Sequence, residues 1–164
     1  MAPPSEYQWN ALFRSYAMCT LLLFIKYFFV QMYSANMNNH PEEDKMLPSA
    51  PVPENIKRRE RMFANDTENI PFHMVVLWGA FVVQCYANLT DEGKNETIAL
   101  TVLMCLYTLC RILHSVFYAF ALQPFRTISF VLANFTVAAV AIVMVVSAFQ
   151  VDTDSFLEPG NRKD

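Results

Sequence analysis

Three polar side chains in the second quarter of the chain have the types and the spacing to bind a small charged molecule. Arg61, Asn65 and Glu68 are separated by four and then three residues, so one face of a helix carries all of them. An arginine binds a carboxylate through two hydrogen bonds, and a carboxylate binds an ammonium group. This triplet therefore indicates a ligand that carries both signs of charge.

A second polar face follows later in the chain. Arg111, His114, Ser115 and Tyr118 fall at helical spacing in an otherwise apolar stretch, and such groups usually face a bundle interior or a wet cavity. Arg111 lies about ten residues from the end of its helix, roughly 15 Å deep at 1.5 Å per residue. Because a buried arginine needs a carboxylate, we predict that Arg111 pairs with Glu68 and organises the pocket. The alternative is that these groups only satisfy one another and fix helix packing.

Arg126 and Thr127 stand in a short polar connection just after the second polar face. A free thiol is mostly protonated at neutral pH, but a nearby cation and a hydroxyl donor lower its pKa and stabilise the thiolate. Guanidinium, amide, carboxylate and phenol groups together suit a small zwitterionic thiol. Glutathione, which has two carboxylates, one ammonium and one thiol, is such a molecule, and lipid-facing surroundings would admit an apolar second substrate.

The elements that must position these residues are membrane helices. Of the 164 residues 54% are hydrophobic and only 16% are charged, too little charge for the surface of a soluble domain this small. The net charge of −3 argues against a nucleic-acid partner. Four stretches are nearly free of charge, and a bilayer-spanning helix needs about 20 apolar residues. We predict helices near 11–35, 54–89, 97–121 and 127–149 in a single domain over residues 1–164.

The connections predict an all-α integral membrane protein with an up-down bundle of four transmembrane helices. The short connection 122–126 forces antiparallel neighbours, and several prolines exclude a regular helix from the long loop 36–53. Lys and Arg concentrate in this loop and at the helix start that follows it, which places the loop in the cytosol and both termini in the lumen. The glycosylation sequons at Asn88 and Asn95 are then lumenal.

Other side chains have plainer interpretations. We predict that the Lys26 ammonium snorkels to the membrane surface and that Pro71 kinks the second helix. The four cysteines lie in apolar helices and indicate buried free thiols. Residues 57–59 form a basic run, interpreted as a juxtamembrane contact with anionic lipid. No His or Cys residues have metal-ligand spacing, so no metal site is predicted.

Three motifs of the chain are similar to those of a known family. The stretch RMFANDTENIPF at 61–72 resembles the second-helix signature of the MAPEG family, in the branch that holds microsomal glutathione transferase and microsomal prostaglandin E synthase. The pattern Arg111-x-x-His114-x-x-x-Tyr118 resembles that branch's third-helix motif, and the turn at 123–126 resembles the one before its fourth helix. The resemblance covers nearly the whole chain.

The resemblance implies a homotrimer in the endoplasmic reticulum membrane, with the mitochondrial outer membrane as an alternative location. It implies that glutathione binds as co-substrate between neighbouring subunits, with Arg126 holding the thiolate, Thr127 donating a hydrogen bond to it and Arg111 organising the pocket. The residues implied to contact glutathione are Arg61, Asn65, Glu68, His114 and Tyr118. The chain departs from the family pattern at several places: Phe63 replaces a histidine, Glu60 stands where the transferases carry a second arginine, no arginine stands near Met32 at the end of the first helix, and the stretch from Tyr118 to Arg126 is one residue short.

From these residues and the resemblance we predict a membrane-bound glutathione transferase that acts in detoxification. It would conjugate the glutathione thiolate to lipophilic electrophiles, with reduction of lipid hydroperoxides as a related activity. Three alternatives stay open. A prostaglandin E synthase-type isomerase would use glutathione without consuming it, a non-catalytic family member would bind and present lipid, and a four-helix scaffold or channel would bind no glutathione.

Overall fold

The computed structural model describes residues 6–34, 54–89 and 94–150, and the regular structure in these ranges is entirely helical. Helix α1 spans Glu6–Ser34, α2 spans Glu54–Leu89, α3 spans Lys94–Ala119 and α4 spans Gln123–Gln150. Each helix contains a stretch long and apolar enough to cross a membrane. The chain is therefore a multi-pass membrane protein. The four predicted membrane spans are confirmed as helices.

The observed helix bounds lie within a few residues of the predicted ones. The bounds of α2 agree with the prediction, whereas α4 begins at Gln123 and thus four residues early. Pro124 falls in the first turn of α4, where its missing N–H leaves no helical hydrogen bond unmade. Two predictions lie outside the described part of the chain. They are the loop 36–53 and the lumenal sequons, whose Asn88 and Asn95 side chains are not among those described.

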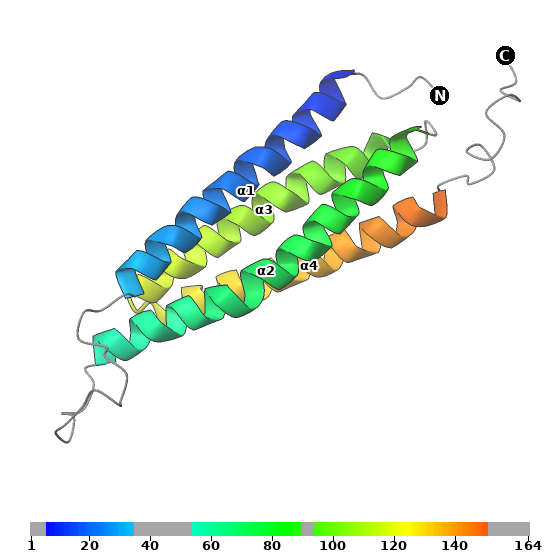
Figure 1. Ribbon diagram of the computed structural model, residues 1–164. Helices are drawn as coiled ribbons and strands as arrows, with labels where there is room; N and C mark the ends of the chain where they lie inside the picture. The colour runs from blue at the N-terminus through cyan, green and yellow to red at the C-terminus, as the bar shows by residue number, and fades with distance from the viewer. Residues whose placement is uncertain (1–5, 35–53, 90–93, 151–164) are drawn as a thin grey trace, which may run out of the picture.

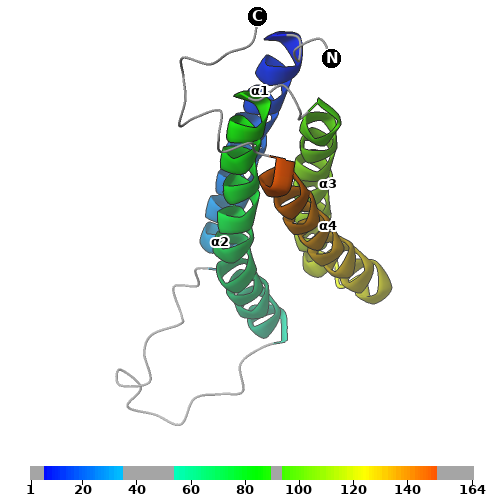
Figure 2. The same ribbon diagram turned by 90° about the vertical axis from the view of Figure 1, so that its right-hand side faces the viewer.

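The four helices form an up-down bundle. Helix α1 packs against α2 and α3, α4 packs against the same two helices, and no contact joins α1 to α4 in the described ranges. Figure 1 shows the helices running side by side along the length of the bundle, and Figure 2 shows α4 tilted away from α2. Helices α1 and α3 end, and α2 and α4 begin, at one end of the bundle, which we call the first-loop end. The ribbon of α2 bends near its middle (Figure 1), and Pro71 is its interior proline.

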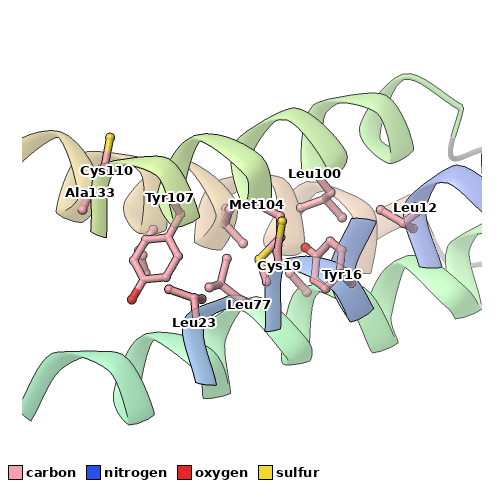
Figure 3. Packing of buried hydrophobic residues seen from close by; sticks show 13 residues of the cluster. Leu12, Tyr16, Cys19, Leu23, Leu77, Leu100, Met104, Tyr107, Cys110 and Ala133 are labelled. Carbon is pink, nitrogen blue, oxygen red and sulfur yellow. The ribbon is translucent and has the colours of Figure 1, made fainter. Parts of the chain in front are cut away.

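Buried stripes at three- and four-residue spacing hold the bundle together. On α1 the buried positions are Leu12, Tyr16, Cys19, Leu23, Lys26 and Val30. On α2 they are Met62, Asp66, Ile70, His73, Leu77, Ala80, Gln84 and Ala87. Figure 3 shows Tyr16 and Leu23 of α1 beside Leu77 of α2 and Met104 of α3 in one apolar cluster. Each stripe thus also carries ionisable or polar residues toward the bundle interior.

A buried amide fastens the end of the bundle opposite the first-loop end. Gln84 Nε2 donates to Thr97 Oγ1 at 3.0 Å, and Ser147 Oγ donates to Gln84 Oε1 at 2.8 Å. The three side chains come from α2, α3 and α4 and are at most 1% exposed. Because unsatisfied polar groups are costly in an apolar interior, this triplet fixes the relative register of three helices.

The turn between α3 and α4 sets where the fourth helix starts. The Leu122 N–H donates to the Phe117 carbonyl at 2.9 Å and the Ala121 N–H to the Tyr118 carbonyl at 3.2 Å. These two hydrogen bonds, with Ala121 at φ 59°, are the C-terminal capping pattern that usually has glycine at the left-handed position. The tight reversal brings the first turn of α4 back onto the last turns of α3.

Two of the four free cysteines lie side by side on neighbouring helices. Cys19 Sγ of α1 is 3.9 Å from Cys105 Sγ of α3. Cys19 and Cys110 are buried as predicted, whereas Cys85 is half-buried and Cys105 is exposed, because these two lie beside the buried stripes of their helices and not on them. All four cysteines are free thiols, as predicted.

We expect a mild membrane-permeant thiol oxidant to link Cys19 to Cys105 within one chain, because the two sulfur atoms already touch. Mass spectrometry of peptides from non-reduced protein would identify the bridged pair. The Cys105→Ser variant should show no bridge at Cys19. A bridge from Cys19 to any other cysteine would contradict the placement of α1 against α3.

Candidate functional site

A single buried carboxylate joins three helices in the half of the bundle nearer the first-loop end. Asp66 of α2 accepts a hydrogen bond from Arg111 Nη2 of α3 at 2.5 Å, and its other oxygen pairs with Lys26 Nζ of α1. The side chains of Asp66 and Arg111 are 0% exposed and that of Lys26 is 8% exposed. Attraction to Asp66 offsets the cost of removing both cations from water, so the three groups stabilise the bundle only as a set.

The predicted pair between Arg111 and Glu68 is therefore wrong. Glu68 is exposed on α2, whereas Asp66 lies on the buried stripe of that helix. Two residues along a helix correspond to a rotation of about 200°, so the two carboxylates point in nearly opposite directions. The choice between them depends on which face of α2 meets α3.

The predicted snorkelling of Lys26 is also wrong. Lys26 occupies the buried stripe of α1, between Leu23 and Val30, so its side chain points into the bundle. Its ammonium reaches Asp66 instead of the membrane surface. A charge at this depth is tolerated because its counter-ion lies on the facing helix.

Arg111 also ties the first predicted polar face to the buried cluster. Its Nη2 donates to Asn65 Oδ1 at 3.2 Å, while its Nε and Nη1 are buried without a hydrogen-bond partner among the described residues. Arg61 stays exposed, with its Nη1 3.9 Å from a Glu54 oxygen. Within one chain, then, the structure brings Asn65 to Arg111 but leaves Arg61 and Glu68 on the outer surface of α2.

The second predicted polar face meets the start of α4 at the first-loop end. The Arg126 guanidinium carbon lies 4.5 Å from the centre of the Tyr118 ring, a cation–π contact. The His114 ring stands edge-on to Tyr118, with centroids 5.7 Å apart. His114, Tyr118 and Arg126 thus form one cluster, called here the Arg126 cluster.

The hydrogen bond of His114 fixes which ring nitrogen can meet a ligand. His114 Nδ1 lies 3.1 Å from the Arg126 carbonyl oxygen, which can only accept, so Nδ1 carries the proton. In the neutral ring Nε2 is then an acceptor, and it is buried without a partner in the described part of the chain. An unpartnered buried acceptor suits a ligand donor such as an ammonium or amide N–H.

Thr127 lies beside Arg126 but is exposed. Its hydroxyl donates to the Gln123 carbonyl at 3.4 Å, a long hydrogen bond within the first turn of α4. The hydroxyl can turn toward a ligand at small cost. In the described ranges, no group of three or more His, Cys, Asp or Glu side chains could hold a metal ion.

Sequence reasoning missed Asp66 and Lys26 as members of this site. The spacing of Arg61, Asn65 and Glu68 marks one face of α2, whereas Asp66 is rotated about 100° from Asn65 and belongs to a different face. A usable signal was present for α2: Asp66, Ile70, His73 and Leu77 follow a buried-stripe spacing. For α1 there was none, because this helix is apolar around most of its surface and several of its large apolar side chains face outward.

A comparison with models of protein families identifies the family of this chain. The MAPEG family model matches residues 16–146, well over half of the chain. The chain belongs to the MAPEG family. The matched range contains both the buried Lys26–Asp66–Arg111 cluster and the Arg126 cluster. Both clusters therefore lie in the MAPEG domain of this protein. Neither a search of curated proteins nor a search of solved structures found a match.

Proposed function

We propose that this MAPEG protein is a membrane-bound glutathione transferase. The observation that carries the proposal is the Arg126 cluster, in which a half-buried guanidinium stands over Tyr118 and beside the anchored His114. A cation held at the level of the membrane surface can stabilise a thiolate that is delivered from water. Family membership supports the same chemistry, and the proposed substrates are lipophilic electrophiles and lipid hydroperoxides.

Each residue of the proposed site has a role that follows from its chemistry. Arg126 stabilises the glutathione thiolate, and Thr127 donates a hydrogen bond to it. His114 Nε2 accepts a hydrogen bond from a glutathione N–H, and Tyr118 holds the Arg126 guanidinium in place. Arg111 positions Asn65, whose amide binds the peptide part of glutathione.

The remaining two residues of the proposed site support assembly as a homotrimer. Arg61 and Glu68 are exposed on α2, where they do not reach the Arg126 cluster of their own chain. A neighbouring subunit in the endoplasmic reticulum membrane would place its own Arg126 cluster against this face. Arg61 would then bind a carboxylate of glutathione, and Glu68 its ammonium.

The proposed reaction needs little from the protein beyond positioning and electrostatics. The thiol proton leaves to water, the sulfur attacks the electrophilic carbon of a substrate partitioned from the bilayer, and the leaving group departs. A thiolate held near Arg126 and an electrophile concentrated in lipid meet at high effective concentration. Stabilisation of the thiolate is the interaction that Arg126 supplies.

We expect glutathione to bind saturably to the detergent-purified protein and to ionise on binding. The ultraviolet absorbance of the thiolate would rise with bound glutathione, because Arg126 favours the charged sulfur. S-methylglutathione, which has no thiol, should bind without this absorbance. Consumption of one thiol per product would separate a transferase from an isomerase, and absence of binding at millimolar glutathione would refute the proposal.

A further inference from the structure

A basic cleft lies at the first-loop end, where α1, α2 and the last turn of α3 meet. Arg58, Arg59 and Asn55 of α2 line it together with Tyr33 of α1 and with Tyr118 and Ala119 of α3. The Arg59 guanidinium carbon stands 4.3 Å from the centre of the Tyr33 ring, which holds this cation in place. Arg59 Nε is buried without a hydrogen-bond partner, and neither arginine forms an ion pair among the described residues. The cleft therefore presents fixed positive charge that is paired with no carboxylate of the described residues.

An apolar groove of about 680 Å³ begins where this cleft ends. It runs between α1 and α3, which lie side by side (Figure 1), with Leu22, Ile25 and Phe29 on one wall and Ile112, Val116 and Phe120 on the other. The ammonium of Lys26, on its floor, is already paired with Asp66. The groove thus offers room for an apolar chain, with no free cation along its length.

The cleft and the groove are continuous. Tyr33, Met62 and Ala119 line both of them, so one molecule can extend from the arginines into the groove. The cleft lies where α1 ends and α2 begins, which is the level at which lipid headgroups meet a membrane helix. The groove lies below it, at the level of the acyl chains.

We propose that an anionic phospholipid is bound here, with its phosphate at Arg58 and Arg59 and one acyl chain in the groove between α1 and α3. Basic pockets between membrane helices attract anionic headgroups, and guanidinium groups hold phosphate oxygens through paired hydrogen bonds. The groove volume falls within the range of about 300–1,000 Å³ typical of small-molecule sites. The charge selects the headgroup, and the groove holds the lipid against exchange with the surrounding bilayer.

The test measures lipid that stays bound to the full-length protein, without glutathione or electrophile. Protein is reconstituted in bilayers containing equal amounts of phosphatidylglycerol and phosphatidylcholine, extracted in mild detergent, washed and examined by native mass spectrometry. We expect phosphatidylglycerol to be retained at least about tenfold over phosphatidylcholine. Equal retention of the two lipids, or retention of neither, would overturn the proposal without any variant being needed.

Two variants and a matched control locate the site. The Arg59→Gln variant removes one of the two headgroup cations, and Ala119→Trp fills the junction of cleft and groove while leaving both arginines in place. Each should lower retained phosphatidylglycerol by about tenfold. Lys57→Gln removes a neighbouring exposed cation that does not line the cleft and should leave retention unchanged.

Other outcomes count against the proposal. If Lys57→Gln lowers retention as much as Arg59→Gln, the lipid responds to surface charge alone. If Ala119→Trp changes the number of subunits while lipid retention stays the same, a second copy of the chain covers the groove. Because the readout is bound lipid, a failed lipid test leaves the proposed transferase activity untouched, and a failed glutathione test leaves the lipid site untouched.

Discussion

Replacing Asp66 with asparagine is expected to prevent the bundle from assembling stably. The variant leaves the buried cations Lys26 and Arg111 without their shared counter-ion, in a cluster where the exposed fractions are 8% and 0%. Removing one partner of a buried ion pair typically costs about 3–5 kcal/mol, because the remaining charge stays uncompensated. The yield of monodisperse protein and the midpoint of thermal unfolding in detergent would both fall.

Glu68→Gln is the matched control for this variant. It makes the same chemical change two residues along the same helix, but at an exposed carboxylate, so we expect a stability change within about 0.5 kcal/mol. Combining Asp66→Asn with Lys26→Met should recover part of the lost stability, since one of the two unpaired cations is gone. If Asp66→Asn were as stable as Glu68→Gln, the buried cluster would not support the fold.

Replacing Arg126 with alanine is expected to lower glutathione-dependent turnover by about 10²–10³-fold while the protein stays folded. Loss of one group that stabilises developing or fixed negative charge in an active site has an effect of this size. The fold should persist because His114 bonds to the backbone carbonyl of residue 126, which the substitution retains. Turnover with a lipophilic aryl halide and the thiolate absorbance of bound glutathione would be measured together.

Two comparisons make the Arg126→Ala result specific. Arg126→Lys keeps the charge but not the planar contact with Tyr118, so we expect an intermediate loss of turnover. Arg14→Ala removes an exposed arginine of α1, far along the sequence from the cluster, and should leave turnover unchanged. Normal turnover and normal thiolate absorbance in Arg126→Ala would exclude Arg126 from the reaction.

The two clusters differ in burial and therefore in their expected roles. The Lys26–Asp66–Arg111 cluster is buried and links α1, α2 and α3, so its main effect is on stability. The Arg126 cluster lies at the end of the bundle and is half-buried, so it can meet a ligand from water. Arg111 connects them, because His114 follows it by about one turn on α3. A change at Asp66 would therefore reach the proposed site through Arg111.

The sequence by itself determined the helices and the family. Charge-free stretches of about 20 residues have one stable solution in a bilayer, because each backbone polar group must be satisfied within its own helix. This is why α2 has its predicted bounds and the other helix ends lie within a few residues of prediction. The motifs around Arg61, Arg111 and Arg126 indicated the family that the comparison confirms.

Only the tertiary structure decided which charged groups meet. Helical spacing says that Arg61, Asn65 and Glu68 share a face of α2, but not that this face points outward while Asp66 points inward. On α1 the apolar residues surround the helix, so nothing in the sequence distinguished a buried Lys26 from one that reaches the surface. The rotation of each helix depends on how its side chains pack against the others, and this packing brought Lys26 and Arg111 to one carboxylate.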